Sequence, residues 1–148
     1  MEKTHIIEKS FKHSNKQCIV RFTNMGHRCG YVAVEKDSPL YGIDYNDVIR
    51  KYYSYLNVHG GLTFSDHLDI FPIRTKGSSY YFGFDCAHYN DAKDFESYKK
   101  YFKKELKNDG IFSSGTVRTL DFCIHECKSL AEQLTELENL IKEQNNVR

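Results

Sequence analysis

The stretch that decides the fold is residues 116–144, TVRTLDFCIHECKSLAEQLTELENLIKEQ. Its apolar side chains recur at spacings of 4, 3, 4, 3 and 4, at Cys123, Cys127, Leu130, Leu134, Leu137 and Ile141. This a/d pattern predicts one long helix, with Thr116 as its N-cap. At about 1.5 Å per residue such a helix is longer than a small domain. We therefore expect part of its apolar stripe to pack on its own sheet and the rest to pair with a second copy of the chain.

The chain before this helix has the composition of β-strands. Residues rich in β-branched and aromatic side chains form short runs at 4–13, 17–24, 29–35, 58–65 and 79–85. A polar turn at residues 13–16 predicts a hairpin between the first two runs, and Asp44 or Asn46 is suited to cap a short helix over 46–55. We expect an α+β fold, in which an N-terminal antiparallel β-sheet with short helices precedes a long C-terminal helix used in dimerisation.

The length of 148 residues suits a single domain, 1–148. We divide it into a β-rich part, 1–92, a lysine-rich helical insertion, 93–110, and the long helix, 116–144. Within the insertion, the spacing of Phe95, Tyr98, Phe102 and Leu106 is that of one apolar helix face, and the residues at 108–110 are typical of a helix stop.

Composition excludes several classes of protein. The 21 basic and 20 acidic residues give a net charge of +1, which provides no field for a long nucleic acid. The longest apolar runs are a few residues, so no membrane span and no signal peptide are expected. Five cysteines form no even disulfide framework and are interpreted as reduced thiols of a cytoplasmic protein.

Catalytic motifs are weak in this sequence. It holds neither a Gly-x-Ser-x-Gly nucleophile elbow nor a phosphate-binding loop. His59, Asp85, Cys86 and His88 are candidate zinc ligands, but they lack a recognised metal spacing, and Cys86 with His88 is only a weak nucleophile–base pair. The paired Gly60 and Gly61 mark a bulge or a close approach, either by a ligand or by the neighbouring backbone. We expect a protein that is not an enzyme and that uses no metal or cofactor.

Two arginines and one aromatic residue favour ligand binding. Arg28 lies at a turn between two glycines, and Arg118 is expected in the first turn of the long helix, where unpaired N–H groups favour an anion. Arginine binds phosphate through two parallel hydrogen bonds, and an aromatic ring such as Phe82 stacks on a base. The alternative for each arginine is a surface ion pair that contributes little.

Several short blocks occur in an order that resembles a known family. They are MGHRCGYVAV (25–34), PLYG (39–42), VHGGLTF (58–64), FGFDCAH (82–88) and RTL (118–120) running into ECKSLAEQL (126–134). In this order they resemble the phage-encoded Thoeris anti-defence proteins of the first type. Those proteins are sponges in the cytoplasm of the infected bacterial host, which bind glycocyclic ADP-ribose without degrading it.

The resemblance implies an α+β homodimer, further assembled into hexamers in some members, with ligand pockets at the dimer contact. It also implies, for some members, separate sites for the cyclic oligonucleotides of CBASS defence. By residue, Phe82 and Arg118 would sandwich the adenine and Arg28 would contact the phosphates. His59 and Asp85 complete the expected ligand-binding set.

Two other functions remain open from the sequence. One is a metal-dependent phosphodiesterase or hydrolase acting on cyclic nucleotides through His59, Asp85 and His88. The other is an inhibitor of a host protein that acts through its long helix.

Overall fold

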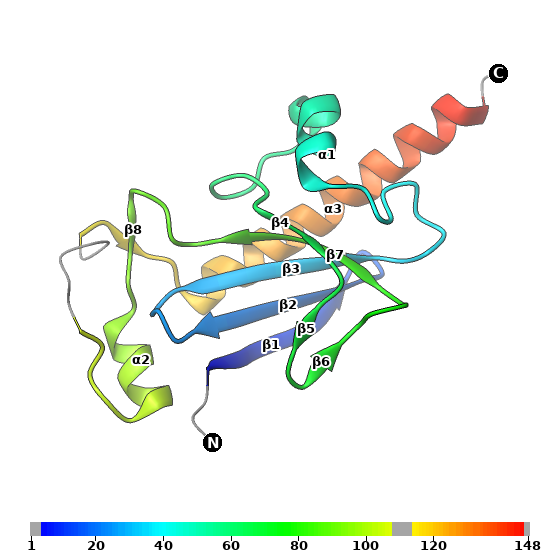
Figure 1. Ribbon diagram of the computed structural model, residues 1–148. Coiled ribbons are helices and arrows are strands. Elements are labelled where there is room, and N and C mark those ends of the chain that lie inside the picture. Colours follow the sequence, from blue (N-terminus) through cyan, green and yellow to red (C-terminus); the bar gives the residue numbers. More distant parts are fainter. Residues whose placement is uncertain (1–3, 108–113, 147–148) are drawn as a thin grey trace.

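The computed structural model describes residues 4–107 and 114–146. Its main sheet has five antiparallel strands in the order β1-β2-β3-β7-β4 (Figure 1). The strands of this sheet are β1 His5–His13, β2 Lys16–Thr23, β3 Arg28–Val34, β4 Phe64–Asp66 and β7 Tyr80–Asp85. The small strands are β5 Asp69–Ile70 with β6 Ile73–Arg74, and β8 Asp91–Ala92 with β9 Thr116–Val117. The helices are α1 Tyr45–Tyr52, η1 Tyr53–Tyr55, α2 Phe95–Phe102 and α3 Leu120–Asn146.

The predicted first hairpin is confirmed, with a two-residue turn. Ser14 and Asn15 have φ values of 51° and 61°, both in the left-handed region. Two such residues match the twist of the flanking strands, as in a type I′ turn. The strands β1 and β2 therefore pair directly from His13 opposite Lys16.

Strand β1 forms one edge of the sheet and carries a bulge. Its register with β2 passes from Ile7 opposite Arg21 to Lys9 opposite Val20, so Glu8 has no partner across the ladder. A bulge of this kind redirects one side chain. Here the side chain at the bulge is that of Glu8, which is only 1% exposed.

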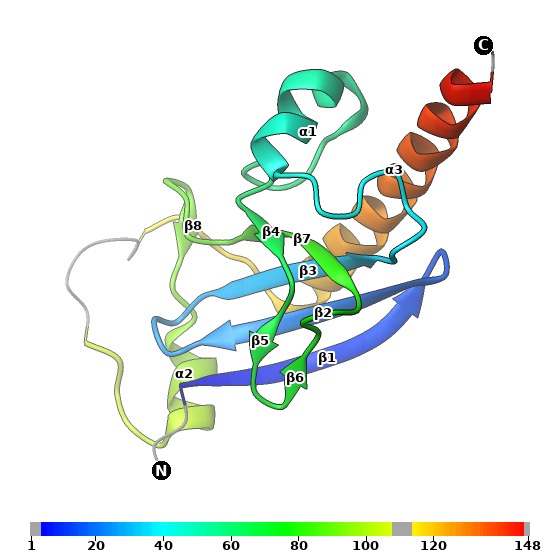
Figure 2. The same cartoon turned by 45° about the vertical axis from the view of Figure 1, so that its right-hand side comes forward.

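Alternation along the strands separates two apolar layers. Side chains on one face, including Val20, Val32, Phe82 and Phe84, pack against α3. Those on the other face, including Ile19, Tyr31 and Tyr81, are covered by Leu68, Ile70 and Ile73 around the β5–β6 hairpin. Figure 2 shows α3 and this hairpin on opposite faces of the sheet. The period-2 pattern thus fixes which residues reach each layer.

The long helix is confirmed, but it begins later than predicted. Thr116 and Val117 form β9, which pairs in parallel with β8. Thr119 performs the capping that we had predicted for Thr116, because its hydroxyl accepts a hydrogen bond from Phe122 N at 3.1 Å. Arg118 therefore precedes α3 and does not lie in its first turn.

The apolar stripe of α3 is buried within its own chain over most of its length. Five of its positions have 0% exposed area: Cys123, Cys127, Leu130, Leu134 and Leu137. Ile141 is half-buried, and the last turns of α3 project beyond the sheet (Figure 1). The sheet therefore buries more of the apolar stripe than we expected. Pairing with a second copy, or with a host protein, would have to use other residues, and it stays a prediction.

Two other local predictions need correction. The run 58–65 is a strand only from Phe64 onward, because Gly60 and Gly61 have φ values of 68° and 79° and turn the chain. The helix of the lysine-rich insertion ends at Phe102, since Lys103 takes the left-handed conformation. The stop predicted at 108–110 lies outside the described residues. The short helix capped by Asp44 is confirmed as α1, with Asp44 Oδ1 accepting from Asn46 N at 2.8 Å.

Truncating a buried stripe residue tests whether α3 serves its own chain. We expect Leu134→Ala to lower the free energy of unfolding by about 2–5 kcal/mol through lost burial and a residual cavity. Leu140→Ala is the matched control and should cost less, because Leu140 is half-buried. Urea unfolding at two protein concentrations measures both effects. A Leu134→Ala loss that depends on concentration would instead assign this position to contacts between copies.

Candidate functional site

A cluster of polar side chains lies at one end of the main sheet. It draws on the end of β7, the turn at residues 58–61, the β8–β9 pair and the segment leading into α3, which meet on one side of the molecule (Figure 1). We call His59, Asp85, His88, Asp91 and Arg118 the end cluster. Three of these residues, His59, Asp85 and Arg118, belong to the ligand-binding set expected from the sequence.

Asp91 organises one half of the end cluster. Its side chain is 1% exposed, and its carboxylate accepts hydrogen bonds from His59 Nε2 at 2.9 Å, Arg118 Nε at 2.7 Å and His88 N at 2.9 Å. The pairing of Asp91 with Thr116 in the β8–β9 ladder brings Arg118 within reach. Burial alone would raise the pKa of Asp91, but these hydrogen bonds outweigh it and hold the pKa below the ordinary value of an aspartate.

Asp85 holds the other half. Its carboxylate accepts from Thr63 Oγ1 at 2.9 Å and from Ala87 N at 3.1 Å. His88 Nε2 lies 3.2 Å from Asp85 Oδ1, which is an ion-pair distance. The same nitrogen is buried and has no hydrogen-bond partner among the described residues. A buried polar atom without a partner is rare and is often found where a protein performs its function.

Gly60 explains the paired glycines of the sequence. A Cβ at Gly60 would lie 2.1 Å from His88 Nε2, and the residue has a positive φ of 68°. The close approach at Gly60 is made by a side chain, the His88 imidazole, which is neither of the two partners that the sequence suggests, a ligand or the neighbouring backbone. The turn can therefore place His59 beside His88 only because position 60 has no side chain.

Aromatic contacts fix the two imidazoles and the guanidinium. The His59 ring meets the His88 ring edge-on, with centroids 5.7 Å apart, and meets Phe122 edge-on at 5.3 Å. Arg118 Cζ lies 5.2 Å from the centre of the same Phe122 ring. Glu126 Oε1 accepts from His59 N at 2.8 Å. The first two turns of α3 thus support both His59 and Arg118.

The side chains of the end cluster are only partly buried. Those of His59, His88 and Arg118 are 17%, 34% and 21% exposed. One nitrogen of each side chain faces Asp91 or Asp85. Among residues 4–107 and 114–146, the two Nδ1 atoms and the Arg118 Nη atoms have no hydrogen-bond partner. These nitrogens could bind an anion.

Arg28 has a structural position in this chain. Its side chain is 4% exposed, and all five of its N–H groups have acceptors: both oxygens of Glu8, Asp94 Oδ2, Ser97 Oγ and the carbonyl of Arg118. Burial would lower its pKa, but the carboxylates of Glu8 and Asp94 raise it. The phosphate contact expected of Arg28 is thus replaced by buried carboxylates, and its link to the end cluster is the hydrogen bond to Arg118 O.

Phe82 also lies away from the surface. It has 0% exposed area and belongs to the core layer under α3, between Val32 and Ser65 of the neighbouring strands. Neither face of its ring is open in this chain. The structure therefore does not bring Phe82 and Arg118 together as a clamp, and the aromatic ring beside Arg118 is Phe122.

The expected metal and thiol alternatives are not formed among the described residues. No group of three or more His, Cys, Asp or Glu side chains there could hold a metal ion. Cys86 Sγ lies 3.6 Å from Cys123 Sγ in the core, and the contact with Cys123 together with burial raises the pKa of the Cys86 thiol. A thiol in this state is a poor nucleophile, so Cys86 and His88 do not act as a pair.

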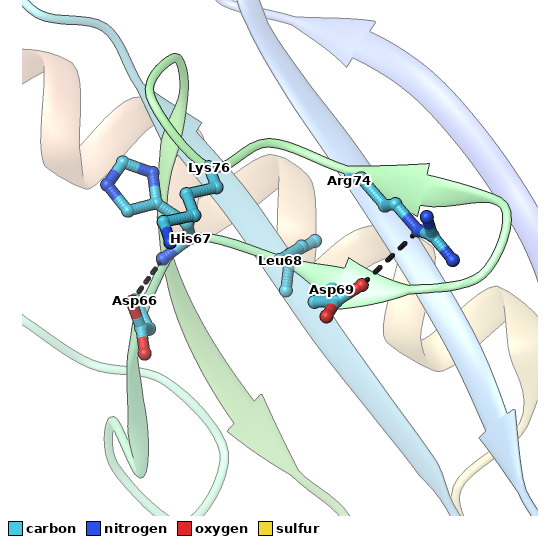
Figure 3. A pocket seen from close by; sticks show the side chains of 6 residues that line it. All are labelled: Asp66, His67, Leu68, Asp69, Arg74 and Lys76. Carbon is cyan, nitrogen blue, oxygen red and sulfur yellow. Dashed lines mark hydrogen bonds and ion pairs between the residues drawn. The ribbon is translucent and has the colours of Figure 1, made fainter.

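The cavities described for this chain lie elsewhere. One, of about 600 Å³, is lined by Asp66, His67, Leu68, Asp69, Arg74 and Lys76 (Figure 3). Asp69 and Arg74 pair across it at 3.5 Å. A second, of about 260 Å³, lies between the β1–β2 turn and α3. No residue of the end cluster lines either of these two cavities.

Sequence reasoning missed four contributors to the end cluster: Thr63, Asp91, Phe122 and Glu126. Thr63 stands inside the VHGGLTF block, and Asp91 follows His88 by three residues, which is a turn spacing. Phe122 and Glu126 are four residues apart on α3, off the apolar stripe. Their position off the apolar stripe was the signal in the sequence that this face of α3 contacts groups other than the core.

Comparisons with known proteins gave no match. No family model matches the chain, and neither the curated proteins nor the solved structures contain a match to it. Within the described residues, no helix is both long and apolar enough to cross a bilayer.

The buried position of Arg28 predicts a large effect on stability. Arg28→Met should lower the free energy of unfolding by about 3–5 kcal/mol, because Glu8 and Asp94 would remain buried without their partner. Arg50→Met is the matched control, since Arg50 pairs with Asp47 but is 77% exposed, and it should cost less than about 1 kcal/mol. Urea unfolding measures both. Small and equal losses of unfolding free energy in the two variants would contradict this and indicate that Arg28 behaves as a surface cation.

The lowered pKa values of Asp91 and Asp94 predict a loss of stability in acid. Both groups bind a proton less readily in the folded than in the unfolded chain, so their contribution is full at neutral pH. It should decrease as the pH falls below about 4, the ordinary range of an aspartate. Unfolding free energies at pH 6, 5, 4 and 3 should fall less steeply for Asp91→Asn than for the unmodified chain. The exposed Asp69→Asn is the control and should leave the slope unchanged, and a slope unaltered by Asp91→Asn would contradict the assignment.

Proposed function

We propose that this chain binds and sequesters a cyclic ADP-ribose-type signalling nucleotide, glycocyclic ADP-ribose, without cleaving it. In the cytoplasm of an infected bacterial host this would block Thoeris immunity. The ordered sequence blocks support the class of ligand. The observation that carries the proposal is the arrangement of Arg118, whose Nε donates to buried Asp91 and whose side chain is 21% exposed, next to His59, which donates to the same carboxylate.

This arrangement suits a pyrophosphate. A guanidinium presents two parallel donors to phosphate oxygens, and its position is already fixed by Asp91 and Phe122, so little rotamer freedom is lost on binding. His59 and His88 add donors when protonated. One face of Arg118 packs on Phe122, and a purine could stack on the other. Phe122 would thus support the guanidinium from the side where the resemblance implied Phe82.

The partial exposure of the end cluster in one chain suggests that a second chain is needed to enclose the ligand. Sequestration with a Kd near 1 nM needs about −12 kcal/mol of binding free energy, which calls for a ligand shielded from water. The end cluster is partly exposed in one chain, at 17–34% for its two imidazoles. We therefore propose that a homodimer closes the site, as the resemblance implies. Cyclic oligonucleotides of CBASS defence are a second ligand class to test at separate sites.

Calorimetric titration with glycocyclic ADP-ribose tests this function. The ligand should bind at a stoichiometric ratio and should be recovered intact after heat denaturation of the complex. Arg118→Ala should weaken binding by about 5- to 150-fold, the equivalent of about 1–3 kcal/mol for a lost charged hydrogen bond. Arg118→Lys, which keeps a charge beside Asp91, should restore only part of the affinity.

Arg50→Ala serves as the control, because Arg50 is an exposed arginine of α1. Its affinity should equal that of the unmodified chain. Recovery of a cleaved nucleotide would rule out sequestration, and an unchanged affinity in Arg118→Ala would rule out the end cluster as the site.

A further inference from the structure

Two imidazole–carboxylate pairs face each other in the end cluster. His59 is paired with Asp91 and His88 with Asp85, and the two rings are in edge-to-face contact at 5.7 Å between centroids. Arg118 is bound to the same Asp91 carboxylate. We propose that His59 and His88 form a metal-independent general acid–base pair that cleaves 3′,5′-phosphodiester linkages next to a free ribose 2′-hydroxyl.

The carboxylates determine which nitrogen of each ring can react. His59 Nε2 lies 2.9 Å from both oxygens of Asp91, so it carries the proton that it donates there. In the neutral ring, Nδ1 then holds a lone pair and can accept a proton. Asp91 acts as a positioning residue, because it fixes this tautomer and stabilises the charge that His59 gains.

His88 is suited to the opposite role. Its Nε2 is enclosed by Gly60 and Asp85, 3.2 Å from Asp85 Oδ1, and has no hydrogen-bond partner among the described residues. When this ring carries a second proton, its Nδ1–H is a donor that can protonate a leaving group.

The reaction balances without a co-reactant. His59 Nδ1 takes the proton of the 2′-hydroxyl, whose oxygen attacks the adjacent phosphorus. The bond from phosphorus to the 5′-oxygen breaks, and His88 Nδ1–H protonates that oxygen. The products are a 2′,3′-cyclic phosphate and a free 5′-hydroxyl. Arg118, through its Nη groups, would stabilise the charge that develops on the phosphate oxygens.

This activity goes beyond the proposed sequestration and is compatible with it. The pyrophosphate of an ADP-ribose-type ligand joins two 5′-oxygens, so neither phosphorus has a 2′-hydroxyl in position to attack it. The same pair of histidines would then hold that ligand unaltered and cleave only a 3′,5′-linked ribonucleotide.

The test uses uridylyl-3′,5′-adenosine with the purified chain in excess EDTA. We expect uridine 2′,3′-cyclic phosphate and adenosine, separated by chromatography, and no cleavage of the 2′-deoxy analogue. His59→Gln and His88→Gln should each lower the rate by about 100-fold or more. His125→Gln is the matched control, because His125 is an exposed histidine of α3 outside the end cluster. Its rate should equal that of the unmodified chain.

The pH dependence gives a second measurement that needs no variant. A reaction that requires one neutral and one protonated imidazole predicts a bell-shaped profile of kcat/KM. Absence of the cyclic phosphate, a rate that survives in both histidine variants, or a rate abolished by EDTA would each overturn the proposal. The calorimetric titration with glycocyclic ADP-ribose is independent of these results, so failure of cleavage with intact binding overturns this inference alone.

Discussion

A buried carboxylate, Asp91, is the constraint on which the candidate site depends. A charge that is 1% exposed must be compensated, and Asp91 is compensated by donors from three separate segments: the turn at 58–61, the turn that follows β7 and the approach to α3. Removing one of these donors would leave a carboxylate lone pair buried without a hydrogen bond. The geometry of His59 and Arg118 is thus a consequence of satisfying one buried anion, and both side chains are positioned before any ligand arrives.

A second buried ion cluster lies next to the first. Arg28 joins Glu8 of β1 to Asp94 at the start of α2, and one of its N–H groups donates to the carbonyl of Arg118 at 3.2 Å. Through that carbonyl, the backbone of Arg118 is held by one cluster and its side chain by the other. This double attachment explains how a residue in an extended segment, outside any long element, keeps a defined orientation toward solvent.

The sequence predicted the elements better than it predicted the site. The stripe of α3 and the turn at Ser14 and Asn15 are local signals, since period and backbone preference need no knowledge of distant residues, and both are confirmed. The site depends on long-range contacts. The set of ligand-binding residues expected from the sequence includes His59, Asp85 and Arg118, which lie in the end cluster, but it does not include Asp91. Arg28 and Phe82 were expected at a ligand site but are buried, Arg28 in an ion cluster and Phe82 in the core. The sequence alone does not distinguish a buried arginine or phenylalanine from one that is exposed at a ligand site.

The bulge at Glu8 has a consequence for how the chain behaves at high concentration. β1 lies at the edge of the sheet, where an unbroken strand of nine residues would offer free backbone groups to another molecule. The unpaired Glu8 interrupts the register, its charge points inward, and Lys9 and Lys12 add repulsion along the same strand. These are the devices by which natural sheets resist edge-to-edge aggregation. The glutamate that neutralises Arg28 therefore also protects the chain from polymerising through its open edge.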